Sequence, residues 1–233
     1  MIRTLKEFIR HLLHIVGVRR KLDYLRHSDR GARFAEIYKT GVWTRGDASA
    51  PGSGQGSSLE ATESIRGRIP ELLKELGTLR ILDVGCGDFT WMSHIDLPCH
   101  YIGVDIVPSV IEDNIRLYGS ANREFFLADS VTDPLPDADT ILCREVLFHL
   151  SFADGISALK NIMSKQRQFI ILTTDKDTSF NADIESGDFR TLNLARKPFR
   201  LPPPFLEIRD DVVASRRLLG VWRAEEIRKA IGS

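Results

Sequence analysis

The spacing of hydrophobic positions changes along the chain, and each spacing predicts a type of element. Over residues 2–16 apolar side chains recur at helical intervals with basic residues between them, which predicts a basic amphipathic helix. A second, short helix is expected over 30–38. Beyond residue 58, short apolar runs alternate with helical patterns. This alternation is typical of a parallel β-sheet covered by helices on both faces.

The α/β region divides into expected elements. Strands are predicted over the apolar runs 79–84, 100–105, 124–128, 139–143 and 168–173. Helices are predicted over 59–76, 89–95, 108–118 and 152–165. Ser57 and Glu60 have the spacing of a capping box, which is expected to begin the first of these helices. The segments 205–211 and 216–222 are expected to pair as an antiparallel hairpin that closes the sheet.

Two stretches interrupt this alternation. Residues 48–58 are rich in Gly and Ser, and their place before the α/β region favours a lid over a bound substrate rather than a plain linker. Residues 175–204 form a connection after the fifth strand that is long for a compact domain and rich enough in apolar residues to be ordered. The sequence thus predicts an N-terminal helical extension with a lid loop (1–58) and an α/β domain (59–233) with a substrate-binding insertion (175–204).

Composition and charge narrow the class of protein. The chain has 233 residues, is 42% hydrophobic and 27% charged, and balances 32 basic with 32 acidic residues. These values are typical of one globular enzyme domain, and the balance creates no overall field that favours nucleic acid. The three cysteines lack metal-ligand spacing. Together with the lack of a signal peptide or a membrane-spanning run, this leads us to expect a cytoplasmic protein.

Residues 1–30 depart from this balance, with eight Lys and Arg against three Asp and Glu. A basic amphipathic helix can lie on an anionic membrane surface. Most amphipathic helices nevertheless bury their apolar face against their own protein. We therefore expect the segment to cap the active site or to pack on the core, with a peripheral membrane contact or a dimer contact as alternatives.

The run Asp83-Val-Gly-Cys-Gly-Asp88 carries the most specific chemical information. A buried strand enters a turn with Gly85 and Gly87, where the backbone can adopt positive φ and a ligand can lie against the main chain. A helix that begins near Asp88 would direct its free N–H groups at that ligand. The third glycine of a dinucleotide fingerprint is missing. The two acids would repel a pyrophosphate and suit an α-ammonium or a sulfonium.

Two more acids end the next strands. Asp105 follows the glycine turn at the distance where a carboxylate accepts hydrogen bonds from ribose hydroxyls. Asp129, which Ser130 follows, can accept one from an adenine amino group. Because the carboxyl ends of parallel strands meet at one edge of a sheet, the three strand ends together describe a site for an adenosine with a cationic amino-acid tail.

These motifs resemble those of the class I S-adenosylmethionine-dependent methyltransferases. The resemblance covers residues 59–231 and is carried by ILDVGCGDF, YIGVDI, FLADS and ILCREVLFHL. It implies a Rossmann-like α/β fold: a seven-stranded, mostly parallel sheet with helices on both faces and an antiparallel last hairpin, plus the N-terminal extension. It also implies S-adenosylmethionine (SAM) as donor and S-adenosylhomocysteine (SAH) as product. The residues expected to bind the donor are Asp83, Gly85, Cys86, Gly87, Asp105, Ile106, Asp129, Ser130 and Arg144.

Methyl transfer to a hydroxyl needs a base that removes the proton of the acceptor as it attacks. His149, after the fourth strand, is the candidate base. Glu145, four residues earlier, would share a helical face with it and raise the pKa of the imidazole. The alternative is that His149 is a hydrogen-bonded packing residue. Methyltransferases with Glu-x-x-Glu-His here bind a divalent ion, but this chain has Phe148 at the second Glu, so a metal is not favoured.

The insertion is expected to contact the acceptor. Its candidate substrate-binding residues are Asn181, Asp183, Arg190 and Asn193, whose side chains suit a polyhydroxylated molecule such as a sugar. Arg190, with Arg196, Lys197 and Arg200, would also suit a phosphate or carboxylate. The same polar residues can instead cap turns. The favoured function is methyl transfer to a hydroxyl of a small molecule or glycan. A protein or RNA methyltransferase and a non-catalytic SAM-binding partner subunit are the alternatives.

Overall fold

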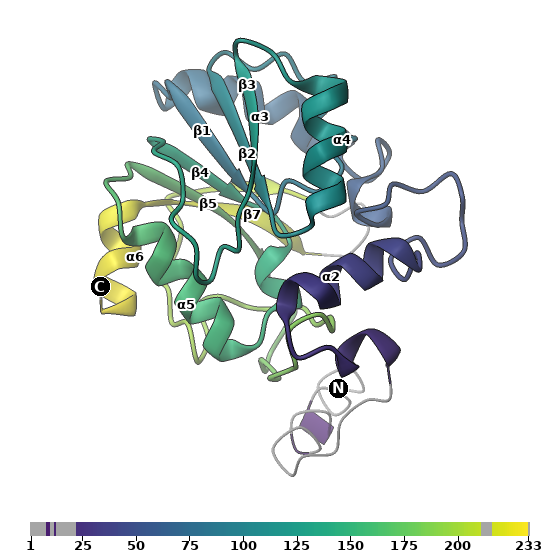
Figure 1. The fold of residues 1–233 in the computed structure, drawn as a ribbon. Coiled ribbons are helices and arrows are strands. Elements are labelled where there is room, and N and C mark those ends of the chain that lie inside the picture. The colour runs from purple at the N-terminus through teal and green to yellow at the C-terminus, as the bar shows by residue number, and fades with distance from the viewer. Residues whose placement is uncertain (1–7, 10–11, 13–21, 211–215, 233) are drawn as a thin grey trace.

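The computed structural model describes residues 8, 9, 12, 22–210 and 216–232. Its core is a seven-stranded sheet with strand order β3-β2-β1-β4-β5-β7-β6 (Figure 1). Neighbouring strands from β3 to β5 are parallel, whereas β7 is antiparallel to both β5 and β6. The structure therefore confirms the Rossmann-like sheet with a reversed last hairpin.

The strands lie close to the predicted apolar runs. Their bounds are β1 Arg80–Val84, β2 His100–Asp105, β3 Arg123–Leu127, β4 Thr140–Cys143, β5 Phe169–Asp175, β6 Leu206–Arg209 and β7 Arg217–Arg223. All four residues of β4 are buried, as expected for a central strand with helices on both faces. Side chains alternate between two cores, since Ile81 belongs to one hydrophobic cluster and Leu82 and Val84 belong to the other.

Helices close both cores. On one face, α3 (Glu63–Glu75) and part of α4 (Pro108–Tyr118) cover the cluster that contains Ile81. On the other face, α5 (Phe152–Met163) and α6 (Ala224–Ile231) lie side by side (Figure 1) and cover the cluster of Leu82 and Val84. The sequence analysis did not predict α6, although its buried positions Ala224 and Ile227 have helical spacing.

The extension places a helix over the carboxyl ends of the strands. This helix, α2 (Arg30–Lys39), begins at Asp29, whose side chain accepts a hydrogen bond from the Ala32 backbone N–H at 2.7 Å. Phe34 and Ile37 bury its inner face in the core. The helix predicted over 2–16 lies outside the described residues except for 8, 9 and 12. Among the described helices, none has the length and apolar character needed to cross a membrane.

Two helix starts differ from the prediction. The capping box at Ser57 does not form, because the hydroxyl of Ser58 instead accepts the Ala61 N–H and holds a turn before α3. The helix expected over 89–95 is reduced to a single 3-10 turn, η3 (Met92–His94). Phe89 has a φ of 58°, in the left-handed region. A right-handed helix therefore cannot begin at Asp88 and continue through this residue.

Candidate active site

One cleft opens at the carboxyl ends of β1, β2, β3 and β4. Helix α2 and the loop over 41–57 form its opposite wall. All nine residues expected to bind the donor line this cleft, and so do both candidate catalytic residues, Glu145 and His149. None of the four substrate-binding candidates is among the lining residues. The structure thus brings together the strand-end residues that the sequence singled out and separates them from those of the insertion.

The floor of the cleft is the turn after β1. Gly85 and Gly87 have φ values of 72° and 59°, which side chains rarely permit. A Cβ at Gly85 would collide with Val146, and one at Gly87 would lie 2.8 Å from the Cβ of Ser53. Both glycines are therefore needed for the conformation and for the close approach of neighbouring chain.

Asp105 ties the end of β2 to this turn. Its carboxylate accepts hydrogen bonds from the backbone N–H of Gly87 at 3.1 Å and of Val107 at 3.0 Å. Burial raises its pKa to about 6, while the backbone hydrogen bonds act in the opposite direction. An ionised carboxylate has about four lone-pair sites. Two of them are used by the backbone, which leaves acceptors for hydroxyl groups in the cleft.

Asp83 is the second buried acid of the cleft. The hydroxyl of Tyr101 donates to its Oδ2 at 2.8 Å. Burial raises its pKa to about 7, and the Tyr101 hydrogen bond and the charge of Arg144 oppose that rise. A cation bound nearby would favour the charged form of this group. Asp83 is therefore suited to a cationic ligand.

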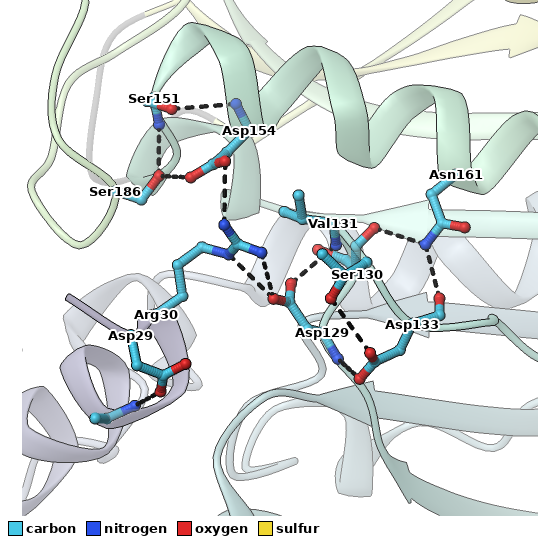
Figure 2. A network of polar contacts seen from close by, with 12 residues as sticks. Asp29, Arg30, Asp129, Ser130, Val131, Asp133, Ser151, Asp154, Asn161 and Ser186 are labelled. Carbon is cyan, nitrogen blue, oxygen red and sulfur yellow. Dashed lines mark hydrogen bonds and ion pairs between the residues drawn. The ribbon is translucent and has the colours of Figure 1, made fainter.

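The third acid, Asp129, joins α2 to the sheet (Figure 2). Its Oδ2 accepts two hydrogen bonds from Arg30, from Nη2 at 2.6 Å and from Nε at 3.0 Å. Arg30 also donates to Asp154 at 3.2 Å, and the hydroxyl of Ser186 donates to the same carboxylate. Oδ1 of Asp129 accepts the Val131 N–H at 2.9 Å and retains a lone pair. Arg30 thus connects α2, the end of β3, α5 and the insertion at this end of the cleft.

The structure corrects the predicted pairing of Glu145 with His149. Glu145 has a φ of 64°, and the residues after it form only a 3-10 turn, η4 (Val146–His149). The four-residue spacing therefore does not place both side chains on one α-helical face. Glu145 forms an ion pair with Arg217 instead. Arg144, expected at the donor, is held by Asp210 through two hydrogen bonds of 2.9 and 3.0 Å.

His149 lies half-buried between two aromatic rings. Its Nδ1 is 3.1 Å from the carbonyl oxygen of Asp188. A carbonyl only accepts, so Nδ1 carries the proton and Nε2 holds the lone pair of the neutral ring. Burial lowers the pKa of His149, and the charge of Glu145 compensates only in part. The expected rise in pKa is therefore wrong, because burial outweighs the carboxylate.

The Gly/Ser-rich loop lies directly on the glycine turn. The side chain of Asp88 accepts hydrogen bonds from Ser53, from its hydroxyl at 2.7 Å and from its backbone N–H at 3.2 Å. Ser53 and Ser57 both line the cleft. Asp88, expected to face a cationic ligand, is therefore used to anchor this loop. Opening of the loop as a lid stays a prediction.

The insertion uses its polar side chains internally. Asn181 donates to the carbonyls of Asn193 and Lys197 and accepts the Asn193 N–H. Asp183 accepts the Phe152 N–H at the start of α5. Arg190 is fully buried and donates to three backbone carbonyls, those of Ala182, Leu147 and Leu150. The Asn193 side chain accepts the Ala195 N–H. These bonds fix the insertion against the sheet and give all four residues a structural use.

The cleft also contains residues that the sequence analysis did not assign. Arg30, Phe34 and Tyr38 line it from one face of α2, and their spacing of four was a readable signal. Trp43 and Trp91 add aromatic walls. Among the described residues, no group of three or more His, Cys, Asp or Glu side chains is arranged to hold a metal ion.

Comparisons with known proteins agree with this geometry. A family model described as "Methyltransferase domain" matches residues 58–230. No curated protein matches the sequence. Human N-acetylserotonin methyltransferase in complex with SAM is similar at 15% identity with a TM-score of 0.57, over 93% of this chain and 66% of that chain. The N-methyltransferase NodS from Bradyrhizobium japonicum WM9 in complex with SAH is 13% identical with a TM-score of 0.56, over 82% and 97%.

A third similar structure is the methyltransferase domain of bacterial CtHen1. It is 21% identical with a TM-score of 0.52, over 70% of this chain and 99% of that chain. At such identities, likeness to these structures shows the shared fold. The assignment of the family rests on the family model, which covers most of the chain.

The Arg30 network predicts a selective effect on stability. Arg30→Gln should lower the free energy of unfolding by about 1–3 kcal/mol, because the arginine is mostly buried and its hydrogen bonds are charge-assisted. Arg26→Gln is the matched control, since Arg26 is 80% exposed and its ion pair among the described residues is with Asp23. It should change stability by less than about 0.5 kcal/mol. Urea denaturation measures the free energy of unfolding of both variants. Equal losses in the two would contradict a stabilising role of the Arg30 network.

Proposed function

The chain belongs to the class I SAM-dependent methyltransferase family, and we propose that it transfers the methyl group of SAM to a hydroxyl of a small molecule, with His149 as general base. The observation that supports this most is the meeting of the strand-end acids and the imidazole of His149 in one cleft. SAM supplies an electrophilic methyl carbon on a sulfonium. The protein must therefore hold the donor, align the acceptor and accept its proton.

The described residues fit the donor. Asp105 retains lone pairs directed at the cleft and suits the two ribose hydroxyls. Asp83 suits a positive group, because a bound cation would offset the cost of keeping its charge buried. The lone pair left on Oδ1 of Asp129 suits an adenine amino group. Gly85 and Gly87 line the same cleft, so the methionyl part can lie next to this turn.

His149 is suited to accept a proton at neutral pH. Its lowered pKa keeps the ring neutral there, so Nε2 is ready to act as base. The carbonyl of Asp188 fixes the tautomer and remains a hydrogen-bond acceptor for the imidazolium that forms. The nearby charge of Glu145 also favours the imidazolium. In our proposal Glu145 acts through its charge rather than by a direct hydrogen bond to His149.

The donor site predicts the effect of Asp105→Asn. Loss of a charge-assisted hydrogen bond to the ribose should weaken SAH binding by about 1.5–3 kcal/mol. Isothermal titration calorimetry with SAH measures this affinity. Asp113→Asn is the control, since Asp113 lies on the exposed side of α4 and pairs with Arg116. Circular dichroism should show that both variants fold. SAH binding that is equally tight in the two variants would contradict the ribose role of Asp105.

His149→Gln should lower kcat by roughly 10²–10⁴-fold and leave the SAH affinity near that of the wild type. The readout is SAH release with an acceptor found by screening small-molecule pools for a mass gain of one methylene. A rate close to wild type would remove His149 as the base. SAH binding without turnover of any acceptor would instead support a non-catalytic partner subunit.

The pH profile tests the same assignment independently. Because the folded-state pKa of His149 is lowered, the base stays neutral until the pH falls below its ordinary value of 6.5. The rate should therefore remain high at pH 6.5 and fall as the pH drops through that lowered pKa. Initial rates between pH 5 and 8 are measured at saturating SAM, so that protonation of Asp83 and Asp105, whose pKa values are about 7 and about 6, does not limit the rate through donor binding. Under these conditions the limb should be missing in His149→Gln. An acid limb centred above 6.5 would contradict the lowered pKa.

A further inference from the structure

Four aromatic rings form a continuous row from the glycine turn to the surface. The ring centroids of Tyr38 and Trp43 are 5.3 Å apart, those of Trp43 and His149 4.8 Å, and those of His149 and Phe189 5.3 Å. At the inner end, the Tyr38 hydroxyl lies close to Gly87. At the outer end, the side chain of Phe189 is 47% exposed. An exposed ring that continues a row leading into a cleft is a candidate part of a binding surface.

The row lies on the acceptor side of the cleft. The three strand-end acids define the donor side, at β1, β2 and β3. Tyr38 and Trp43 belong to the opposite wall, which α2 and the loop after it form. Methyl transfer is an in-line displacement, so the acceptor must approach the methyl group from the side away from sulfur. Because the ring centroids of Trp43 and His149 are 4.8 Å apart, an acceptor next to His149 can stack on Trp43.

The charges at the cleft disfavour an anionic acceptor. Among the described lining residues, Arg30 is paired with Asp129 and Asp154, and Arg144 is paired with Asp210. The basic residues that were predicted from the sequence to suit a phosphate lie outside this cleft. Arg196, Lys197 and Arg200 surround a separate depression. An anionic acceptor would therefore be desolvated without an available counter-ion.

The polar groups also disfavour a sugar. The four insertion residues that would recognise several hydroxyls are used in hydrogen bonds within the protein. The acceptor wall offers aromatic rings and few hydroxyls, those of Ser53, Ser57 and Tyr38. Each sugar hydroxyl that enters such a site without a partner loses its hydrogen bonds to water. A flat aromatic ring loses few hydrogen bonds to water when it enters the site, because its faces stack on aromatic side chains.

We propose that the acceptor is a neutral hydroxylated aromatic ring that stacks on Trp43, with Phe189 at the entrance and its hydroxyl directed at Nε2 of His149. This inference rests on the proposed function and gives its acceptor a chemical class. In the reaction, the acceptor oxygen provides the electron pair of the new O–C bond. The bond between the methyl carbon and sulfur breaks with its pair going to sulfur, and the hydroxyl proton passes to His149. A phenolic hydroxyl, with a pKa of about 10, suits an imidazole base far better than an alcohol does.

The test uses matched acceptors and matched variants. A panel of phenols, their saturated cyclohexanol analogues, carboxylated phenols and simple sugars is assayed by SAH release and by product mass. We expect turnover of neutral phenols and at least tenfold lower kcat/KM for the other three classes. Trp43→Ala should raise the KM for the phenol at least tenfold, Trp43→Phe less, and the SAH affinity should stay unchanged in both. Phe189→Ala should raise KM by a smaller factor.

Phe126→Ala is the control for Phe189→Ala. Phe126 is 44% exposed on β3 and, unlike Phe189, has no ring contact with the row among the described residues, so its loss should leave KM for the phenol unchanged. Turnover of sugars or cyclohexanols at rates equal to phenols would overturn the aromatic acceptor while leaving hydroxyl methylation intact. An unchanged KM in both Trp43→Ala and Phe189→Ala would overturn the stacking surface. SAH binding without methylation of any hydroxyl compound would overturn the proposed function as well.

Discussion

The site depends on the hydrogen bond between the backbone N–H of Gly87 and the carboxylate of Asp105. This bond joins the turn after β1 to the end of β2, so that both lie at the same cleft. The turn can approach so closely because its two glycines have positive φ. The buried carboxylate, with its pKa raised to about 6, retains its charge at neutral pH through these backbone donors. The ligand site is therefore built from main chain and strand ends, and the helices position the groups that surround it.

The N-terminal extension completes the cleft rather than standing apart from it. Arg30 holds α2 against the end of β3 and the start of α5, and Arg33 donates to the backbone carbonyl of Ser186 in the insertion. The loop after α2 is held by a hydrogen bond from the Ser53 hydroxyl to the side chain of Asp88. The segment after β5 therefore stabilises α2, while α2 and the loop after it line one wall of the cleft. This division of roles explains why the polar residues of the insertion are buried in internal hydrogen bonds.

The sequence predicted the sheet and the meeting of the strand-end acids in one cleft, because both depend on local patterns. Apolar runs mark the buried strands, and Asp83, Asp105 and Asp129 are placed by strand ends that neighbouring parallel strands bring together. The row of rings around His149 was not predicted, because Trp43 and Phe189 meet His149 only through packing between distant segments. Glu145 was misassigned because its positive φ breaks the helical spacing on which the pairing depended. For Asn181 and Arg190, polarity alone does not distinguish a ligand contact from an internal hydrogen bond.

The most direct measurement of the central claim is a crystal structure of the protein with SAH. We expect the ribose hydroxyls to lie within hydrogen-bond distance of Asp105 and the sulfur to lie above the turn of Gly85 and Gly87. The side of the sulfur where a methyl group would stand should face Trp43 and His149. SAH bound elsewhere, or bound in the cleft with its ribose turned away from Asp105, would contradict it.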